Sequence, residues 1–317
     1  MPSSHSSWQW ANISSYAAGA NNKLYHFLPF TKTPACGTYC ANLKTCFFVD
    51  IIVLLVLVIS ALSTVSEPTA DDDNLDHEDP FFEQVKAAFR SFGRPMWSLF
   101  LVTTLNWIAW FPFLMYNTDW VGTEVYGGFL DGNHQQRNFY DMGVRAGALG
   151  IMLTAASLGL MSLAVDPLSK LLGGSRYLWG IVNFVPSACL ASTVWVTRKA
   201  EHGRNSMPTP YSPPKTDVKT ATFALFAATG IPQAVTFSIP FALASMFSSE
   251  TGSGHGLSLG VMNLAIVIPQ MFVALISGSL DAAFGGGNLP AFVLGAISSA
   301  LSGIFALTIL PSPVSKA

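Results

Sequence analysis

Two carboxylates follow a group of aromatic side chains in the middle of the sequence. Asp119 and Glu124 come shortly after Trp110 and Tyr116. Carboxylates accept paired hydrogen bonds from neighbouring hydroxyl groups, and aromatic faces stack on the apolar face of a pyranose ring, so this combination suits sugar recognition. Residue types alone favour a plainer interpretation, in which an aromatic belt at a membrane interface precedes a solvated acidic loop.

Three uncharged polar side chains lie inside apolar stretches: Asn106, Asn263 and Gln270. A polar group in hydrocarbon needs a hydrogen-bonding partner, which either a water-filled cavity or a neighbouring helix supplies. Gln270 directly follows Pro269, where a helix would kink, and we expect it to face a cavity. For Asn106 and Asn263, a cavity and an interhelical hydrogen bond worth about 0.6 kcal/mol are equally good interpretations.

The composition indicates which kind of element carries these residues. Charged residues make up 11% of the 317 residues and hydrophobic residues 50%, whereas a soluble domain has about 25% charged residues. Sixteen Lys and Arg against eighteen Asp and Glu leave a net charge of −2, and nucleic-acid binding requires a basic surplus. The composition therefore predicts a polytopic membrane protein that does not bind nucleic acid.

Seven stretches are long and apolar enough to cross a bilayer, which takes about 20 residues per helix. The basic residues fall outside these stretches or at their edges. Among the acids only Asp50 lies clearly inside one, and we expect it to cap its helix at the membrane interface. The stretches lack the polar stripe of a helix in a soluble bundle. The sequence thus predicts an all-α polytopic membrane protein with spans at 47–66, 96–116, 145–165, 177–197, 219–247, 257–280 and 290–310.

Five prolines lie within these spans. Each removes a backbone donor and is tolerated where neighbouring protein or a water-filled cavity satisfies the freed carbonyl. Proline is also common in membrane helices generally, which explains any single one equally well. Together they are consistent with kinked helices around a pathway, at Pro112, Pro186, Pro232, Pro240 and Pro269.

The segments between the spans differ in character. Residues 67–95 are strongly acidic, and we expect them to be largely disordered up to about Pro80. Apolar residues recur at helical spacing over 81–94, which predicts a short amphipathic helix at the membrane surface. The cysteines at the other end of the first span lack the spacing of a zinc site, which leaves a disulfide in a non-cytosolic loop open for Cys36, Cys40 and Cys46.

Several runs of sequence resemble a known family. The runs 106–113, 116–120 and 124–127 (NWIAWFPF, YNTDW and EVYG) resemble the seventh helix and following loop of plant sucrose:proton symporters, in the glycoside–pentoside–hexuronide:cation branch of the major facilitator superfamily. Further similar runs lie at 35–36, 39–44, 46–48, 230–232, 237–242, 256–261, 266–270 and 284–292. The resemblance extends from about residue 11 to residue 313.

The resemblance implies twelve helices in two halves, of which this sequence would hold the C-terminal part. The proton-binding acid of the family lies on helix 4, which the resemblance places before this sequence. On that plan the chain divides into a remnant of helix 5 at 1–20, a non-cytosolic loop at 21–46, helix 6 at 47–66, a central cytoplasmic acidic loop at 67–95, a C-terminal six-helix bundle (helices 7–12) at 96–310 and a cytoplasmic tail at 311–317.

The resemblance also favours a functional role for the carboxylates, because the family has required charges in this loop. Two positions depart from the family: Asn117 stands where Asp is usual, and Thr123 stands where Arg is usual. Since threonine cannot supply the positive charge of arginine, coupling to protons is left open. The expected residues of the substrate pathway or gate are Asn106, Trp107, Trp110, Asp119, Glu124, Asn263 and Gln270.

A short turn between the third and fourth spans resembles a cytoplasmic motif of facilitators. Asp166, Lys170 and Arg176 surround Gly173 and Gly174. We expect these charges to act as a conformational latch through charge pairs and helix dipoles. A tight polar turn is the alternative interpretation, and the spacing does not decide between the two.

The function implied by the resemblance is sucrose transport by proton symport with alternating access. The alternative is a truncated, transport-incompetent membrane protein that associates with or regulates full-length sugar transporters. An enzyme is not expected, and no cofactor is expected beyond the coupling proton. The implied partners are sucrose, protons, the lipid bilayer and, as an open alternative, a homo- or hetero-oligomer with full-length transporters. The implied location is the plasma membrane, with the vacuolar membrane as the alternative.

Overall fold

The computed structural model describes residues 24–33, 38–64, 86, 89–90, 92–206, 213–251 and 255–311. Within these residues the chain is helical and contains no β-strand, which confirms the predicted all-α class. The expected remnant of helix 5 at 1–20 lies outside the described residues. So do most of the acidic loop at 67–95 and nearly all of the tail at 311–317.

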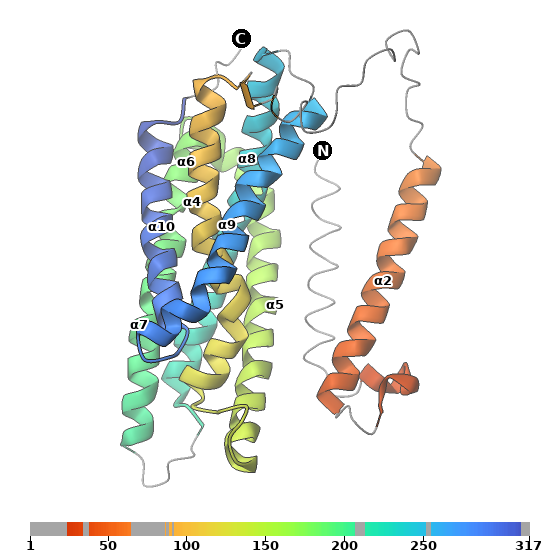
Figure 1. The fold of residues 1–317 in the computed structure, drawn as a ribbon, viewed down its shortest axis with the longest axis vertical. Coiled ribbons are helices and arrows are strands. Elements are labelled where there is room, and N and C mark those ends of the chain that lie inside the picture. The colour runs from red at the N-terminus through yellow and green to blue at the C-terminus, as the bar shows by residue number, and fades with distance from the viewer. Residues whose placement is uncertain are drawn as a thin grey trace.

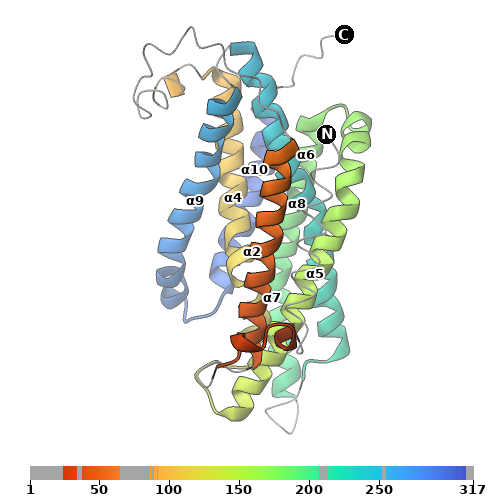
Figure 2. The ribbon, with the colours of Figure 1, turned by 90° about the vertical axis from the view of Figure 1, so that its right-hand side faces the viewer.

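Seven helical segments of the described chain are long and apolar enough to cross a membrane, which confirms the predicted number. They are formed by α2 (Thr38–Thr64), α4 (Arg94–Trp120), α5 (His134–Leu171), α6 (Ser175–Val182) with α7 (Phe184–Asn205), α8 (Thr216–Thr251), α9 (His255–Ala283) and α10 (Leu289–Thr308). Helices α4 to α10 form one elongated bundle, seen from two directions in Figures 1 and 2.

Except for α2 and α10, the membrane-spanning helical segments extend beyond the predicted spans at both ends. Helix α5 has 38 residues, a length of about 57 Å at 1.5 Å per residue, whereas the hydrocarbon core is about 30 Å thick. It begins at a capping box, in which the Asn133 side chain accepts from Gln136 N and the Gln136 side chain accepts from Asn133 N. Hydropathy therefore located the apolar middle of this helix, and the cap sets its start.

Arg145 lies on the helical extension that precedes the apolar middle of α5. It is the first residue of the predicted span 145–165, whereas α5 begins at His134. Its side chain is half-buried, and its Nε is buried without a hydrogen-bond partner in the described chain.

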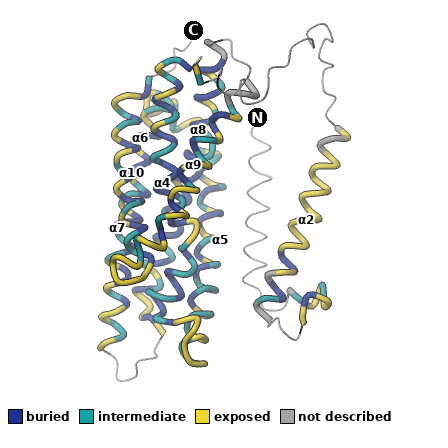
Figure 3. The backbone as a smooth tube through the Cα atoms, viewed as in Figure 1, coloured by how far each residue is buried: buried dark blue, intermediate teal, exposed yellow. Residues whose placement is uncertain are grey.

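Helix α2 is apolar on every side. Figure 1 shows it standing apart from the other labelled helices. Among the described residues, its main contacts are with the short 3-10 turns η1 (Leu24–His26) and η2 (Pro29–Thr31). Figure 3 shows its exposed middle, where the apolar side chains from Phe47 to Ile59 are uncovered. A helix of this kind requires lipid or another protein surface around it. Asp50 does not cap it as expected, because the helix already begins at Thr38.

The start of α2 is joined to the turns that precede it. Tyr25 N donates to Asn42 Oδ1 at 2.9 Å, and the hydroxyls of Thr31 and Thr45 are 3.0 Å apart. Cys40 forms a disulfide, in line with the alternative left open by the sequence. The predicted loop 21–46 therefore includes the first turns of this helix.

Helices α6 and α7 form one span that is interrupted at Asn183. Pro186 follows three residues later and has no N–H to donate to the carbonyl of Val182. Of the five prolines inside predicted spans, this is the one beside a helix boundary; α4, α8 and α9 continue through theirs.

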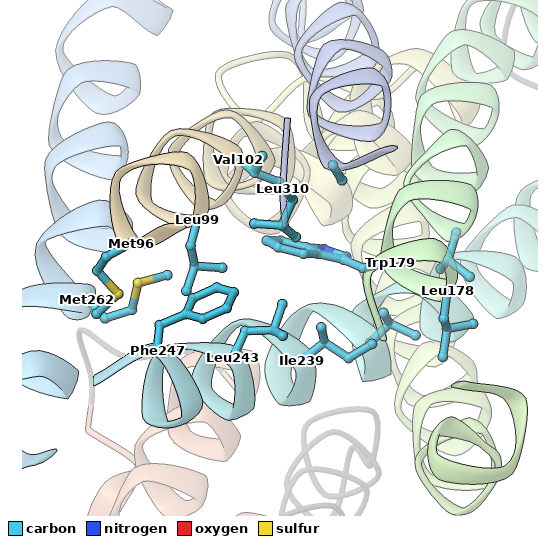
Figure 4. Packing of buried hydrophobic residues seen from close by; sticks show 14 of the residues in the cluster. Met96, Leu99, Val102, Leu178, Trp179, Ile239, Leu243, Phe247, Met262 and Leu310 are labelled. Atoms are coloured by element: carbon cyan, nitrogen blue, oxygen red, sulfur yellow. The ribbon is translucent and has the colours of Figure 1, made fainter. Parts of the chain in front are cut away.

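Two groups of buried apolar side chains hold the bundle together. The first joins α4, α6, α8 and α9, and Figure 4 shows its members Leu99, Trp179, Leu243 and Met262. The second joins the other end of α4 to α8 and α10, and its largest members are aromatic: Trp110, Phe113, Trp120, Phe226 and Phe292. Buried aromatic side chains contribute about 150–250 Å² of contact area each. This second group fixes the end of α4 against its neighbours.

The predicted amphipathic segment 81–94 is described only in part. The Phe89 ring lies 5.7 Å from the ring of Trp97 and 5.9 Å from that of Phe100. Phe92 is buried in the first apolar group. The described apolar residues of this segment thus pack against the start of α4.

Candidate functional site

The two carboxylates singled out in the sequence lie where α4 ends. Helix α4 continues to Trp120 and passes directly into one π-helical turn, η4 (Val121–Val125). Asp119 and Glu124 therefore lie on continuous helical backbone and not in the loop that was expected after residue 116. π-helical turns are rare and occur frequently at functional sites.

Both carboxylates are hydrogen-bonded by neutral groups from other helices. Asp119 Oδ1 accepts from Tyr140 Oη at 2.8 Å, and Asp119 Oδ2 accepts from Asn288 Nδ2 at 2.8 Å. Glu124 Oε1 accepts from the backbone N–H of Asn288 at 2.6 Å, and Glu124 Oε2 accepts from Thr197 Oγ1 at 3.0 Å. Asn288 thus contacts both acids, and four helical segments meet at this point: α4 with η4, α5, α7 and the start of α10.

The turn that presents Asn288 consists of three glycines. Gly285, Gly286 and Gly287 all have positive φ values, of 90°, 87° and 101°, a region that favours glycine. A Cβ atom on Gly287 would lie 3.1 Å from Glu124 Oε1. The Glu124 carboxylate therefore reaches the N-terminus of α10, where a negative charge is stabilised by the helix dipole.

Arg204 holds the backbone of the same turn. Its Nη1 donates to the carbonyl oxygens of Glu124 and Val125, both at 2.8 Å. Gly127 has a φ of 71°, and a Cβ there would lie 2.8 Å from Arg204 Cδ. Arg204 therefore satisfies carbonyls that end the helical turn, and within the described residues its hydrogen bonds go to the backbone and not to either carboxylate.

Other cations near this end of the bundle have their own partners. Lys199 Nζ lies 2.8 Å from Asp217 Oδ2 and 4.8 Å from the centre of the Trp195 ring. Lys219 Nζ lies 5.8 Å from the centre of the Tyr126 ring. Burial raises the pKa of the Tyr126 hydroxyl, which therefore stays protonated at neutral pH.

The two positions that depart from the resemblance do not contact the carboxylates. Thr123 Oγ1 donates to the backbone carbonyl of Asp119 at 2.8 Å. Asn117 is buried, and its Nδ2 donates to the carbonyl of Leu114 at 3.3 Å. Both side chains bond within their own helix, so neither supplies the carboxylates with a donor.

Asn106 lies at the centre of a second polar cluster, in the interior of the bundle. Its Nδ2 donates to Asn183 Oδ1 at 2.7 Å, and its Oδ1 accepts from Thr236 Oγ1 at 3.2 Å. Trp110 Nε1 donates to Thr236 Oγ1 at 3.2 Å, and Asn183 Nδ2 donates to Ser302 Oγ at 3.1 Å. Asn106 is fully buried, so of its two interpretations the structure favours the interhelical hydrogen bond.

The remaining predicted pathway residues are scattered. Trp107 is buried and its ring lies 5.9 Å from that of Phe237. On α9, Asn263 is exposed and Gln270 is half-buried, and neither forms a hydrogen bond within the described chain. The structure therefore joins Asp119 with Glu124, joins Asn106 with Trp110, and keeps the two α9 residues apart from both clusters.

Of the three charged residues in the predicted latch, Arg176 bonds to another helix within the described residues. Arg176 Nη2 donates to the carbonyl of Leu307, in the last turn of α10, at 2.7 Å. A cation at a helix C-terminus is favoured by the helix dipole, as the sequence argument required. Asp166 and Lys170 are exposed and form no ion pair or hydrogen bond within the described residues, because α5 continues past both of them.

Sequence reasoning missed every partner of the carboxylates. Tyr140, Thr197 and Arg204 are ordinary helix residues in the sequence, and nothing in their spacing connects them to Asp119 or Glu124. Asn288 had a signal, because a polar residue after three glycines indicates a tight turn that ends at a helix N-terminus. Within the described residues, no group of three or more His, Cys, Asp or Glu side chains is placed to hold a metal ion.

Comparison with known proteins identifies the relatives of this chain. The sucrose transport protein SUT2 of rice (Oryza sativa subsp. indica) is 39% identical over 305 residues, which cover 95% of this chain and 60% of that protein. SUC4 of Arabidopsis thaliana is 38% identical over 308 residues, covering 95% of this chain and 59% of that protein. This chain is a homologue of the plant sucrose transport proteins. No family model matches it.

The chain spans about 60% of the length of the relatives it matches, and that length fits their C-terminal part. Rice SUT5 gives the same result, with 38% identity over 315 residues and 58% of that protein covered. These relatives are named as transport proteins and not as enzymes. Together with the seven apolar helices, they support an integral membrane protein.

Proposed function

We propose that this chain is the C-terminal part of a proton-coupled sucrose carrier that works by alternating access in the plasma membrane. Its identity of 38–39% to plant sucrose transport proteins over 95% of its length supports the substrate. The observation that carries the proposal is the pair of carboxylates, Asp119 and Glu124, joined through Asn288 where four helical segments meet.

Sugar recognition follows from the chemistry of this pair. A carboxylate accepts hydrogen bonds from two vicinal hydroxyls, and here both acids already accept from an uncharged hydroxyl, Tyr140 on Asp119 and Thr197 on Glu124. A sucrose hydroxyl is the same kind of donor. In the proposal, these two acids form the outer gate of the sugar pathway, and this half of the carrier supplies one wall of it.

Proton coupling rests on the resemblance of the chain to proton symporters. The coupling acid of that family lies on helix 4, and the segments matched here correspond to helices later in the plan. In the proposal, the N-terminal part of the carrier supplies the proton acceptor, and Asp119 and Glu124 take part in the gate. No other cofactor enters the proposal.

The proposal is tested by uptake of labelled sucrose in cells that lack their own sugar uptake. The chain is produced alone and together with the N-terminal part of rice SUT2. We expect background uptake from the chain alone and uptake above background from the pair, abolished by a protonophore. Uptake by the pair is expected to fall at least tenfold in Glu124→Gln, while the exposed control Glu201→Gln keeps it.

Two results would contradict the proposal. Uptake by the pair that survives a protonophore would exclude proton symport. If the pair does not transport and the chain instead lowers the uptake of co-produced full-length SUT2, the regulatory alternative is favoured. Thr123→Arg in the pair tests the departure from the family, and we expect it to raise uptake because it adds a cation beside the two acids.

A further inference from the structure

Asn288 has an unusual arrangement for a residue at the start of a helix. Asparagine at this position normally accepts a hydrogen bond from a backbone N–H of the first helical turn. Here the side chain makes no such bond, although it is buried with 5% of its surface exposed. It donates to Asp119 Oδ2 instead, at 2.8 Å. The backbone N–H of the same residue donates to Glu124 Oε1 at 2.6 Å.

Each oxygen of the two carboxylates therefore has one donor. Tyr140 and Asn288 occupy Asp119, and Thr197 and Asn288 occupy Glu124. A sugar hydroxyl that bonds to either acid must share an oxygen or displace a donor. Tyr140 and Thr197 reach the site from the interior of long helices, whereas Asn288 follows a turn of three exposed glycines. Of the donors, Asn288 is the one whose backbone has the conformational freedom to withdraw.

We propose that Asn288 is a positioning residue that closes the gate by occupying one oxygen of Asp119 and one of Glu124, and that sucrose competes with it for these oxygens. This inference rests on the proposed function. Sugar binding would then be linked to movement of the 285–288 turn and of the N-terminus of α10. The turn is held at its other side by a hydrogen bond from Gly286 N to Asp281 O at 2.7 Å, which anchors it to the end of α9.

The competition has a consequence that distinguishes it from a purely structural role. Removal of the Asn288 amide frees Asp119 Oδ2, so the sugar no longer has to displace a donor. In the open state, Asn288 has left Asp119 Oδ2 and the sugar can bind. The apparent affinity for the sugar rises when this state becomes more populated. A residue that merely holds the site in shape would have the opposite effect, because its loss would weaken sugar binding.

The experiment measures equilibrium binding of labelled sucrose and thermal unfolding of the purified 317-residue chain in detergent. Asn288→Ala is expected to lower the dissociation constant for sucrose about fivefold, and to lower the midpoint of unfolding by about 2–4 °C. Asn288→Asp keeps the size of the side chain, removes the donor and adds repulsion to Asp119, and we expect it to act in the same direction. Asn205→Ala is the matched control, because Asn205 is exposed at the end of α7 and its side chain forms no hydrogen bond within the described residues.

The outcomes separate the inference from the proposed function. If the unsubstituted chain binds no sucrose, the sugar-binding role of this half fails and the competition fails with it. If it binds sucrose and both Asn288 variants bind equally well or more weakly, only the inference about Asn288 is overturned.

A double-mutant cycle tests the contact between Asn288 and Asp119 without sugar. It can also be used if one of the variants is poorly stable. The unfolding midpoints of Asp119→Ala, Asn288→Ala and the double variant are compared. We expect the double variant to lose clearly less than the sum of the single losses, since both remove the same hydrogen bond. Additive losses would overturn the closing role of Asn288.

Discussion

At the scale of single residues, Glu124 is the acid whose carboxylate lies at a helix N-terminus. Its carboxylate accepts the backbone N–H of Asn288 at the N-terminus of α10, where a negative charge is worth about 0.3–1 kcal/mol. Glu124→Gln is therefore expected to lower the midpoint of thermal unfolding by about 1–4 °C. Glu201→Gln is the control, and an equal loss in both variants would contradict a specific role of Glu124.

Asn106 gives a second prediction at this scale. Asn106→Ala leaves the side-chain Oδ1 of Asn183 without its donor from Asn106 and the Thr236 hydroxyl without its acceptor, both buried. Each unsatisfied buried group costs about 1–3 kcal/mol, so we expect a free energy of unfolding lower by about 2–4 kcal/mol in a reversible detergent titration. Asn263→Ala removes the same amide from an exposed position, and it should change stability by less than about 0.5 kcal/mol. Similar losses in the two variants would show that the buried network does not contribute.

The sequence alone could identify some of these residues but not their partners. Asp119 and Glu124 stand out because acids are rare in this chain and these two follow a run of aromatic residues. Tyr140, Thr197 and Asn288 come from three other helical segments, up to 169 residues away, and such contacts arise only from the packing of the bundle. Asn106 was recognised as a polar residue in an apolar span, but its choice between a cavity and a helix interface depends on which helix faces it.

At the scale of elements, the backbone conformation of the turn between α9 and α10 places Asn288 against the two carboxylates. Gly287→Ala would force an L-residue into a φ of 101° and place its Cβ 3.1 Å from Glu124 Oε1. We expect a loss of about 1–3 kcal/mol in the free energy of unfolding. Gly278→Ala is the matched control, because Gly278 lies within α9 and a Cβ there meets no atom within 4 Å.

The control is expected to change stability in the other direction. Alanine in a helix interior is favoured over glycine by about 0.8–1.0 kcal/mol, so Gly278→Ala should leave unfolding unchanged or raise its free energy. If Gly287→Ala is tolerated as well as Gly278→Ala, the turn does not require its left-handed glycine.

The existence of each helix was predictable at this scale, but its ends were not. Hydropathy detects the residues that cross hydrocarbon, which are only the middle of α5 and α8. The start of α5 is set by a local capping box at Asn133, and the end of α4 by a π-helical turn. For this reason the expected loop after residue 116 is helical, and the helical backbone of α5 begins before Arg145, the first residue of its predicted span.

At the scale of the whole molecule, the described residues form a packed bundle and one helix beside it. Helices α4 to α10 bury two apolar groups between them, whereas α2 exposes apolar side chains on all sides. Such a helix needs lipid or a protein neighbour on every face.

Helix α10 connects the two ends of the bundle, because side chains of opposite charge from other segments bind its two termini. Glu124 accepts the N–H of Asn288 at its N-terminus, and Arg176 donates to the Leu307 carbonyl in its last turn. Both signs are those favoured by the helix dipole. The 20 residues of α10 separate the two contacts by about 30 Å, and contacts this far apart without a shared partner are expected to act independently.

Independence leads to a prediction for the molecule as a whole. Glu124→Gln and Arg176→Gln should each lower the free energy of unfolding. The loss in the double variant should equal the sum of the two single losses to within about 0.5 kcal/mol. Only Glu124→Gln should change sucrose binding, because the proposed sugar site lies at that end alone. A coupling between the variants above about 1 kcal/mol would show instead that α10 transmits a change from one end of the bundle to the other. In that case, the 285–288 turn and the Arg176 contact would belong to a single switching element, and opening at one end would loosen the other.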